Sequence, residues 1–176
     1  KERAVKNPLV SVIMNCYNSD QYLQEAIESM YAQTYSNWEI IFWDNASTDN
    51  SANIAKSYDD RVKYFLASET TLLGEARNFA LERATGEYIA FLDCDDIYLP
   101  DKLDRQVDLM QVEDYIMCYG GASIINEEGK VIKRHTVKNK SGNVFAKLLR
   151  HYEVNMQTVM LKREFIVSNQ LSFNID

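Results

Sequence analysis

Three of the four residues from Asp93 to Asp96 are aspartates, and this acidic run could hold a metal ion. Carboxylates this close together repel one another, and burial at the end of a strand would increase the repulsion. A turn needs one such residue rather than three. A divalent cation removes the conflict, because Mg²⁺ and Mn²⁺ prefer carboxylate oxygens and accept water and phosphate as further ligands. The run therefore predicts a Mg²⁺ or Mn²⁺ site whose natural partner is a diphosphate.

The sequence lacks the glycine-rich loops that commonly hold phosphates, since neither G-x-G-x-x-G nor the P-loop pattern occurs. A diphosphate bound to this chain would depend on the metal and on a few cationic or helix-terminal groups. Arg77, near the start of a predicted helix, is the best-placed cation. An exposed helical arginine without a binding role explains the same residue equally well.

Two further polar clusters follow predicted strands. Asn15–Asn18 follows the strand over residues 9–14, and Asp44–Asp49 follows the strand over residues 38–43. Ligands of open α/β sheets bind outside the carboxyl ends of the strands, where the acidic run also falls. Each cluster alone is explained as turn and helix-cap residues, and Asp20 is predicted to cap the helix that follows the first cluster.

The first 110 or so residues alternate short β-branched or aromatic runs with helical periods. Strands are predicted over residues 9–14, 38–43, 62–66 and 88–92, and helices over about 22–31, 54–58, 74–84 and 99–110. The strand runs are almost continuously apolar, which is typical of strands buried on both faces. This alternation predicts an α/β fold with a mainly parallel, doubly wound sheet flanked by helices.

The alternation of strands and helices ends near residue 112. A hairpin is predicted from a strand over 115–125, a turn over 126–129 and a return strand at 131–132. After it we predict a helix over 142–151, an extended segment over 154–161 and a helix from 163. We expect a single domain with a nucleotide-binding half over about 8–112 and a smaller mixed α+β half over about 113–176.

Composition excludes several classes of protein. The 176 residues include 46% hydrophobic and 26% charged residues, which are globular values, and the net charge of −7 argues against nucleic-acid binding. No apolar run approaches the length of a transmembrane helix, and no signal peptide is recognisable at the start. Cys16, Cys94 and Cys118 fit free thiols in a reducing cytoplasm better than a disulfide framework.

Several spaced segments together resemble the family-2 glycosyltransferases, which have the GT-A fold. They are Val10–Asn18, Gln33–Tyr35, Trp38–Ile41, the G-x-A-R-N stretch Gly74–Asn78, and Thr85–Asp96. The resemblance implies a nucleotide-diphosphate sugar donor, a Mn²⁺ or Mg²⁺ cofactor, and transfer with inversion at the anomeric carbon. The usual role of family members further implies a glycan or lipid-linked acceptor. It also implies polysaccharide assembly on the cytoplasmic side of a bacterial membrane.

The resemblance also assigns roles to individual residues. Base and ribose contacts are assigned to Asn15, Tyr17, Asp44 and Asn45. The metal ligand is Asp95, and Asp96 supports the metal site. Asp93 contacts ribose or donor sugar, and Arg77 lies near the diphosphate or sugar. The family usually has two aspartates where this chain has Asp44 and Asn45. Because an amide donates as well as accepts hydrogen bonds, this difference bears on the choice of base, for which we expect uracil.

Inverting transfer needs a general base, and the resemblance places it in an acidic motif well after the metal site. The stretch Ser172–Asp176 resembles the residues just before that motif, and neither His135 nor His151 matches its position. We therefore expect the base to lie beyond Asp176, with this chain a truncated form that binds donor but transfers sugar poorly. Peripheral membrane association would then belong to the longer enzyme.

Three alternatives remain at this point. A sugar-nucleotide pyrophosphorylase would carry a glycine-rich basic loop after the first strand, where this chain has Asn15–Ser19. A receiver-type signalling domain would place an acidic pair after the first strand, where this chain has Asn15 and Cys16. A binding-only relative or donor-binding fragment is the third, and the intact acidic run argues against lost catalysis.

Overall fold

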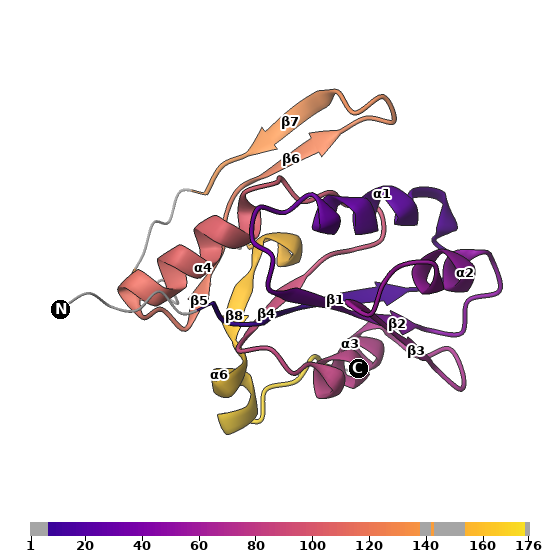
Figure 1. Ribbon diagram of the computed structural model, residues 1–176, viewed down its shortest axis with the longest axis horizontal. Coiled ribbons are helices and arrows are strands. Elements are labelled where there is room, and N and C mark those ends of the chain that lie inside the picture. Colours follow the sequence, from indigo (N-terminus) through magenta and orange to yellow (C-terminus); the bar gives the residue numbers. More distant parts are fainter. Residues whose placement is uncertain (1–6, 138–141, 143–153, 175–176) are drawn as a thin grey trace.

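A six-stranded sheet forms the centre of the computed structural model, which describes residues 7–137, 142 and 154–174 (Figure 1). The strand order is β3-β2-β1-β4-β8-β5. The strands are β1 (Val10–Cys16), β2 (Trp38–Asp44), β3 (Val62–Leu66), β4 (Tyr88–Phe91), β5 (Met117–Cys118) and β8 (Met160–Lys162). Strands β1 to β4 are mutually parallel, and β8 runs antiparallel to both β4 and β5. The predicted α/β, mainly parallel sheet is confirmed.

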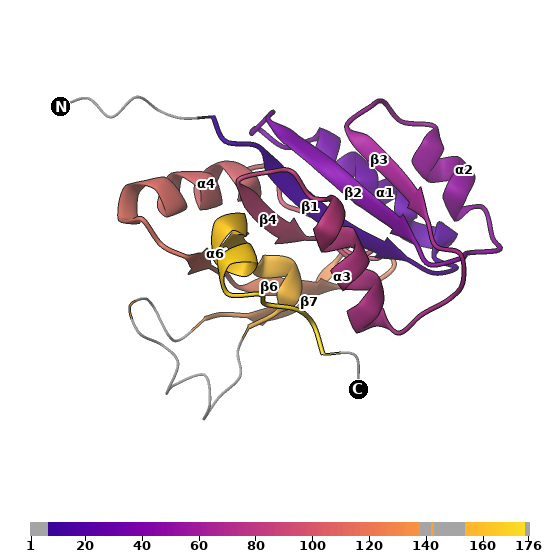
Figure 2. The same ribbon diagram turned by 90° about the horizontal axis from the view of Figure 1, so that it is seen from below.

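Helices cover both faces of the sheet. Helices α1 (Asp20–Tyr31), α2 (Ser51–Lys56) and α4 (Lys102–Glu113) pack on one face, and α3 (Leu73–Arg83) and α6 (Arg163–Ser168) lie on the other, which Figure 2 shows in front. Every residue of β2 and β4 is buried, in agreement with the continuous apolar runs of these strands. No helix in the described part of the chain is both long and apolar enough to cross a bilayer.

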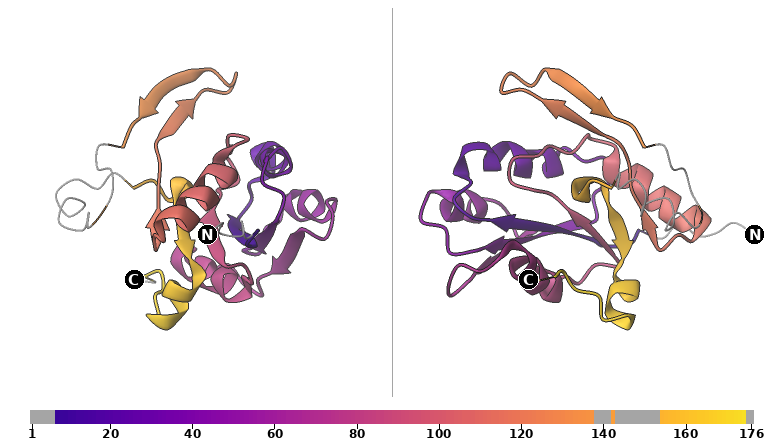
Figure 3. Two further views of the ribbon diagram at one scale, coloured as in Figure 1. Left: turned by 60° about the vertical axis from the view of Figure 1, so that its left-hand side comes forward. Right: turned by 180° about the vertical axis from the view of Figure 1, so that it is seen from behind.

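The smaller half differs from the prediction in two places. The strand expected over 115–125 is broken into β5 and β6 (Ala122–Ile125), which belong to different sheets. The break falls at Gly120–Gly121, and a Cβ on Gly121 would lie 2.5 Å from the carbonyl oxygen of His135, so the chains approach too closely for a side chain. Strand β6 pairs instead with β7 (Val131–His135) in a hairpin that stands away from the main sheet (Figure 3).

The segment expected to be extended over 154–161 contains a 3₁₀ turn, η1 (Met156–Thr158), before β8 begins. The side chain of Asn155 caps this turn by accepting from the Gln157 amide at 3.3 Å, which explains why the local polar residues override the extended preference. The helix predicted over 142–151 lies outside the described residues, apart from Gly142.

Asp20 does not cap α1 as predicted but is its first residue. Its carboxylate accepts from the Asn50 amide at 3.2 Å, and the Asp49 carboxylate accepts from the Asp20 amide at 3.0 Å. Each aspartate therefore satisfies a backbone N–H group belonging to the other helix start, which favours negative charge there. The exchange fixes the amino ends of α1 and α2 together beside the carboxyl edge of the sheet.

A buried glutamate joins the parallel strands. Glu39 on β2 accepts from the Ser11 hydroxyl at 2.5 Å and from the Thr85 hydroxyl at 2.8 Å, and it forms an ion pair with Lys63 on β3. Burial raises the pKa of the Glu39 carboxyl, but its bonds to Lys63, Ser11 and Thr85 outweigh burial and leave that pKa below its ordinary value. Gly86 completes the joint, because a Cβ there would lie 2.6 Å from the Ser11 amide nitrogen.

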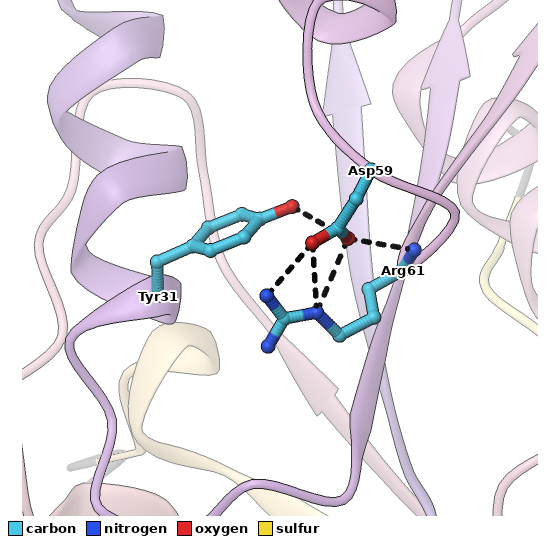
Figure 4. Close-up of polar contacts among 3 residues, drawn as sticks. All are labelled: Tyr31, Asp59 and Arg61. Atoms are coloured by element: carbon cyan, nitrogen blue, oxygen red, sulfur yellow. Dashed lines mark hydrogen bonds and ion pairs between the residues drawn. The ribbon is translucent and has the colours of Figure 1, made fainter.

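A second polar cluster closes the amino edge of the sheet (Figure 4). The Arg61 guanidinium lies 4.4 Å from the ring centres of both Tyr31 and Trp38, and it binds Asp59 at 2.9 Å. The Tyr31 hydroxyl donates to the same carboxylate at 2.8 Å. This cluster lies where β2 and β3 begin, at the opposite edge of the sheet from the acidic run. Its role is therefore to hold the end of α1 on the sheet.

Replacing Glu39 by alanine tests the joint. The Glu39→Ala protein should lose about 3 kcal/mol of unfolding free energy in urea, because several buried donors lose their acceptor. Glu82→Ala is the matched control, since the Glu82 side chain is 66% exposed and its loss should change the free energy by less than about 0.5 kcal/mol. Equal urea midpoints for the two variants would contradict the proposed role of Glu39.

Candidate functional site

The acidic run lies at the carboxyl end of β4, where the strand order changes direction. Strand β1 has β2 on one side and β4 on the other. From β1 the chain first adds β2 and β3 on one side and then crosses to add β4 on the other side. Asp93, Asp95 and Asp96 each offer one carboxylate oxygen, and these oxygens all lie within 4.8 Å of one another. Open α/β sheets bind ligands at such a switch point, and three carboxylates at this spacing suit one divalent cation.

The electrostatics of the cluster agree with the expected repulsion. Burial, together with the charges of Asp93 and Asp95, raises the pKa of the Asp96 carboxyl to about 6. The metal-free arrangement thus disfavours full ionisation at this site. A cation placed between the three carboxylates would reverse that effect, because opposite charge favours the ionised form.

Asp93 is held from two sides. Arg77 on α3 approaches one carboxylate oxygen of Asp93 at 3.4 Å, and the Gln157 side chain donates to the other. The Arg77 side chain is only 17% exposed, and its guanidinium lies over the Phe173 ring at 5.4 Å. Arg77 is therefore part of the site rather than an exposed helical arginine. Gln157 was not predicted, because nothing local in the sequence links η1 to a loop 64 residues earlier.

The G-x-A-R-N stretch is explained by packing against the segment that follows α6. A Cβ on Gly74 would overlap the carbonyl oxygen of Asn174, and Ala76 is only 1% exposed. The Asn78 side chain donates to the Phe173 carbonyl at 3.0 Å and accepts from the Phe173 amide at 2.8 Å. The stretch thereby fixes Phe173 beneath Arg77, which orients the arginine toward Asp93.

The residues expected at the end of β1 lie beside the acidic run. The side chain of Tyr17 is 53% exposed at the carboxyl edge of the sheet. The Asn15 side-chain amide nitrogen is buried and makes no hydrogen bond within the described part of the chain. A buried donor without a partner is costly, so this nitrogen is available to a ligand oxygen or a water.

Asp44 and Asn45 reach the same edge, but their side chains are engaged with the protein. Asp44 is fully buried and accepts from the Tyr64 hydroxyl at 2.6 Å and from the Ser47 amide at 2.7 Å. Asn45 donates to the Thr71 carbonyl at 2.8 Å and accepts from the Thr71 amide at 3.2 Å. These contacts hold the loops after β2 and β3, so both residues shape the crevice before any ligand arrives.

Two thiols lie under the site. Cys16, Cys94 and Cys118 are free thiols in the structure, and all three are buried. A hydrogen bond with Cys94 is the main reason that the pKa of the Cys16 thiol falls to about 7. In the structure the Cys94 thiol donates to the Asn15 carbonyl at 3.3 Å, which connects the acidic run to the end of β1.

A groove of about 750 Å³ opens beside Asp93. It is shared with the acidic site through Arg77 and Gln157, and its volume falls within the range of small-molecule pockets. Its other lining residues come from the β5–β6 connection, the end of β7 and the start of η1: Gly120, Gly121, Ala122, His135, Thr136, Val137, Val154, Asn155 and Met156. The smaller half thus supplies a wall next to the acidic cluster.

Comparison with protein families decides between the classes considered above. The model of glycosyl transferase family 2 matches residues 11–166, which include every element of the site just described except the contacts to Phe173 and Asn174. The chain belongs to glycosyl transferase family 2. That membership argues against both the pyrophosphorylase and the receiver domain.

Curated relatives are glycosyltransferases of several bacteria. An uncharacterised glycosyltransferase of Haemophilus influenzae is 38% identical over 162 residues, covering 90% of this chain and 64% of its own length. The Escherichia coli enzyme WfgD, named as a UDP-Glc:alpha-D-GlcNAc-diphosphoundecaprenol beta-1,3-glucosyltransferase, is 34% identical over 166 residues, covering 94% of this chain and 64% of its own length. The chain therefore spans somewhat less than two thirds of these family-2 relatives.

Solved structures show the same fold at lower identity. Staphylococcus aureus TarS 1–349 in complex with UDP-GlcNAc matches with a TM-score of 0.79 at 21% identity, over 94% of this chain and 48% of that one. The Pyrobaculum calidifontis mannosyltransferase PcManGT, in complex with GDP-Man and Mn²⁺, matches with a TM-score of 0.67 at 23% identity, over 99% of this chain and 51% of that one. These likenesses confirm the GT-A fold of this family-2 chain.

The Asn78 contacts make a local prediction. Asn78→Ala should accelerate hydrogen exchange at the Phe173 amide about five- to tenfold, because that amide loses a bond contributing about 1 kcal/mol. Asn53→Ala is the control, since the exposed Asn53 side chain donates to the Asn50 side chain at 2.8 Å within the α2 region. Unchanged exchange at Phe173 in the Asn78 variant, measured by NMR, would show that the G-x-A-R-N stretch does not hold this segment.

Proposed function

We propose that this chain binds a nucleoside-diphosphate sugar through a divalent cation, Mn²⁺ or Mg²⁺, and that the protein transfers the sugar with inversion to a glycan or lipid-linked acceptor. The observation that carries the proposal is the set of three carboxylates within 4.8 Å of one another at the switch point of the sheet. Family membership supports the reaction class, and the Mn²⁺ named with PcManGT supports the cofactor.

Each acidic residue has a distinct environment, and we assign its role accordingly. Asp95 is the exposed member of the set, so we assign it as the principal metal ligand. Asp93 is turned toward Arg77 and Gln157, so it is suited to touch the ribose or donor sugar as well as the ion. Asp96 is half-buried beside them and supports the site. The bound ion supplies charge stabilisation to the departing diphosphate.

The proposed base is uracil. WfgD takes UDP-Glc according to its name, and TarS was solved with UDP-GlcNAc, whereas PcManGT was solved with GDP-Man. We assign the base and ribose contacts to the exposed Tyr17 and to the Asn15 side-chain nitrogen, which has no hydrogen-bond partner among the described residues. Asp44 and Asn45 then act by shaping the crevice, with base contact requiring an exchange of their present partners.

The acceptor is proposed to bind in the groove beside Asp93, since that groove shares Arg77 and Gln157 with the donor site. WfgD supports a lipid-linked acceptor, because its name specifies a diphosphoundecaprenol-bound sugar. We further propose that the protein works in the cytoplasm at the inner face of a membrane. A donor-binding fragment without transfer activity is the alternative for these 176 residues.

Calorimetric titration with UDP, GDP and TDP tests the donor site. With Mn²⁺ present, UDP should bind most tightly, and removal of the metal by a chelator should weaken its binding at least about tenfold, or about 1.4 kcal/mol. Asp95→Ala should cause the same loss with Mn²⁺ present. Asp108→Ala, which removes an exposed carboxylate on α4, should bind like the unaltered protein.

Tighter binding of GDP than of UDP would overturn the uracil assignment and leave the metal site intact. Equal UDP affinity with and without Mn²⁺, or in the Asp95→Ala protein, would overturn the metal assignment itself.

A further inference from the structure

The β6–β7 hairpin stands apart from the main sheet, yet its turn is firmly built (Figure 3). The Asn126 side chain accepts from the Lys130 amide at 2.8 Å and from the Glu128 amide at 3.2 Å. The Gly129 amide donates to the Asn126 carbonyl at 2.8 Å. A two-stranded hairpin is only marginally stable in water, so one that stands alone gains stability from a surface that covers it.

Strand pairing places one face of the hairpin at the groove beside Asp93. Cross-strand partners share a face, and Ala122 on β6 lies opposite His135 on β7. Both residues line the groove. Because successive side chains of a strand point to opposite faces, the residues that alternate with this pair point away from the groove.

The face that points away from the groove is aliphatic and cationic. Ser123 lies opposite Arg134, and Ile125 lies opposite Val131. Ile132 is the extra residue of the bulge in β7, and it shares the face of Arg134, two residues further on. The three aliphatic residues Ile125, Val131 and Ile132 are 40%, 43% and 64% exposed. Together with Arg134 they form what we call the outer face, and adjoining exposed aliphatic side chains mark an interaction surface.

The hairpin is also a local excess of positive charge in an acidic chain. Lys130, Lys133 and Arg134 outnumber Glu127 and Glu128 at the turn, whereas the whole chain has a net charge of −7. The ion pairs formed within the described part of the chain do not involve these three cations. An anionic surface would therefore attract the hairpin and repel the rest of the molecule, which selects one orientation of approach.

An anionic bilayer fits this combination better than a second copy of the chain. Isoleucine and valine side chains can enter the boundary between lipid headgroups and acyl chains, while lysine and arginine remain at the level of the phosphates. A twofold interface presents the same residues from both sides. Two hairpins that met through the outer face would therefore bring the cations of both copies together, at a cost in free energy.

We propose that the outer face of the β6–β7 hairpin is a docking surface for a bilayer that contains anionic phospholipid. Ile125, Val131 and Ile132 enter the interface, and Arg134 pairs with lipid phosphates. The docking itself depends only on the hairpin. Its use in catalysis rests on the proposed function, because it presumes that the groove on the opposite face receives a lipid-linked acceptor held in the same bilayer.

Vesicle flotation in a density gradient tests the docking surface. The protein should float with vesicles of equal parts phosphatidylcholine and phosphatidylglycerol and remain at the bottom with phosphatidylcholine alone. Raising the salt concentration from about 0.1 M to about 1 M should release it, because the screening length falls from about 10 Å to about 3 Å.

Substitutions on the hairpin separate its two contributions. Arg134→Ala should weaken binding to the anionic vesicles about fivefold, the effect of one basic residue at such a surface, and Arg134→Lys should bind like the unaltered protein. Ile132→Asn should weaken binding at least about tenfold, because an aliphatic side chain no longer enters the interface. Leu66→Asn is the matched control, since Leu66 is 61% exposed on the edge strand β3 and its loss should leave flotation unchanged.

Equal flotation with neutral and anionic vesicles, or none while the urea midpoint shows a folded protein, would overturn the docking surface. Equal losses in the Ile132 and Leu66 variants would do the same. A dimer that forms without lipid and is abolished by Ile132→Asn, with no vesicle binding, would assign the outer face to a second copy instead.

Titration of the same samples with UDP and Mn²⁺ separates this proposal from the proposed function. A protein that binds UDP but does not float with anionic vesicles would contradict the docking surface alone. A protein that floats but binds no UDP would leave the docking surface standing and contradict the donor site.

Discussion

Three carboxylates that repel one another are held together after β4, and the surrounding structure serves to keep them there. Their oxygens lie within 4.8 Å of one another, and burial combined with the neighbouring charges raises the pKa of Asp96 to about 6. Such an arrangement is unfavourable without a cation and favourable with one. A divalent ion at this point, where a parallel sheet binds its ligand, would relieve the repulsion.

The restraints on this cluster come from distant parts of the chain. The parallel register of β1 and β4 sets the height of the acidic run, and the Glu39 joint fixes both strands at their amino ends. Arg77 and Gln157 hold Asp93 from α3 and η1. Asn78 in turn holds Phe173 under Arg77. Contacts from α3 and from the groove-lining turn η1 thus meet at the Asp93 carboxylate.

Much of the fold and of the candidate site could be predicted from the sequence, because the strands are apolar runs that end in polar clusters. The parallel half and the place of the acidic run followed from local pattern alone. Long-range contacts did not: the pairing of Gln157 with Asp93, or of Asn45 with Thr71, depends on how separate loops meet in space. The prediction of one strand over 115–125 was wrong because Gly120–Gly121 allow a close backbone approach, which the spacing of apolar residues does not reveal.

We propose that the acidic run holds the ion that meets the donor diphosphate. Diffraction from crystals grown with Mn²⁺ and UDP, recorded near the manganese absorption edge, tests it most directly. We expect one anomalous peak bound by Asp95 and by oxygens of the diphosphate, with Asp93 still facing Arg77. A bound nucleotide with no peak at the acidic run, or a peak bound only by residues outside Asp93–Asp96, would contradict it.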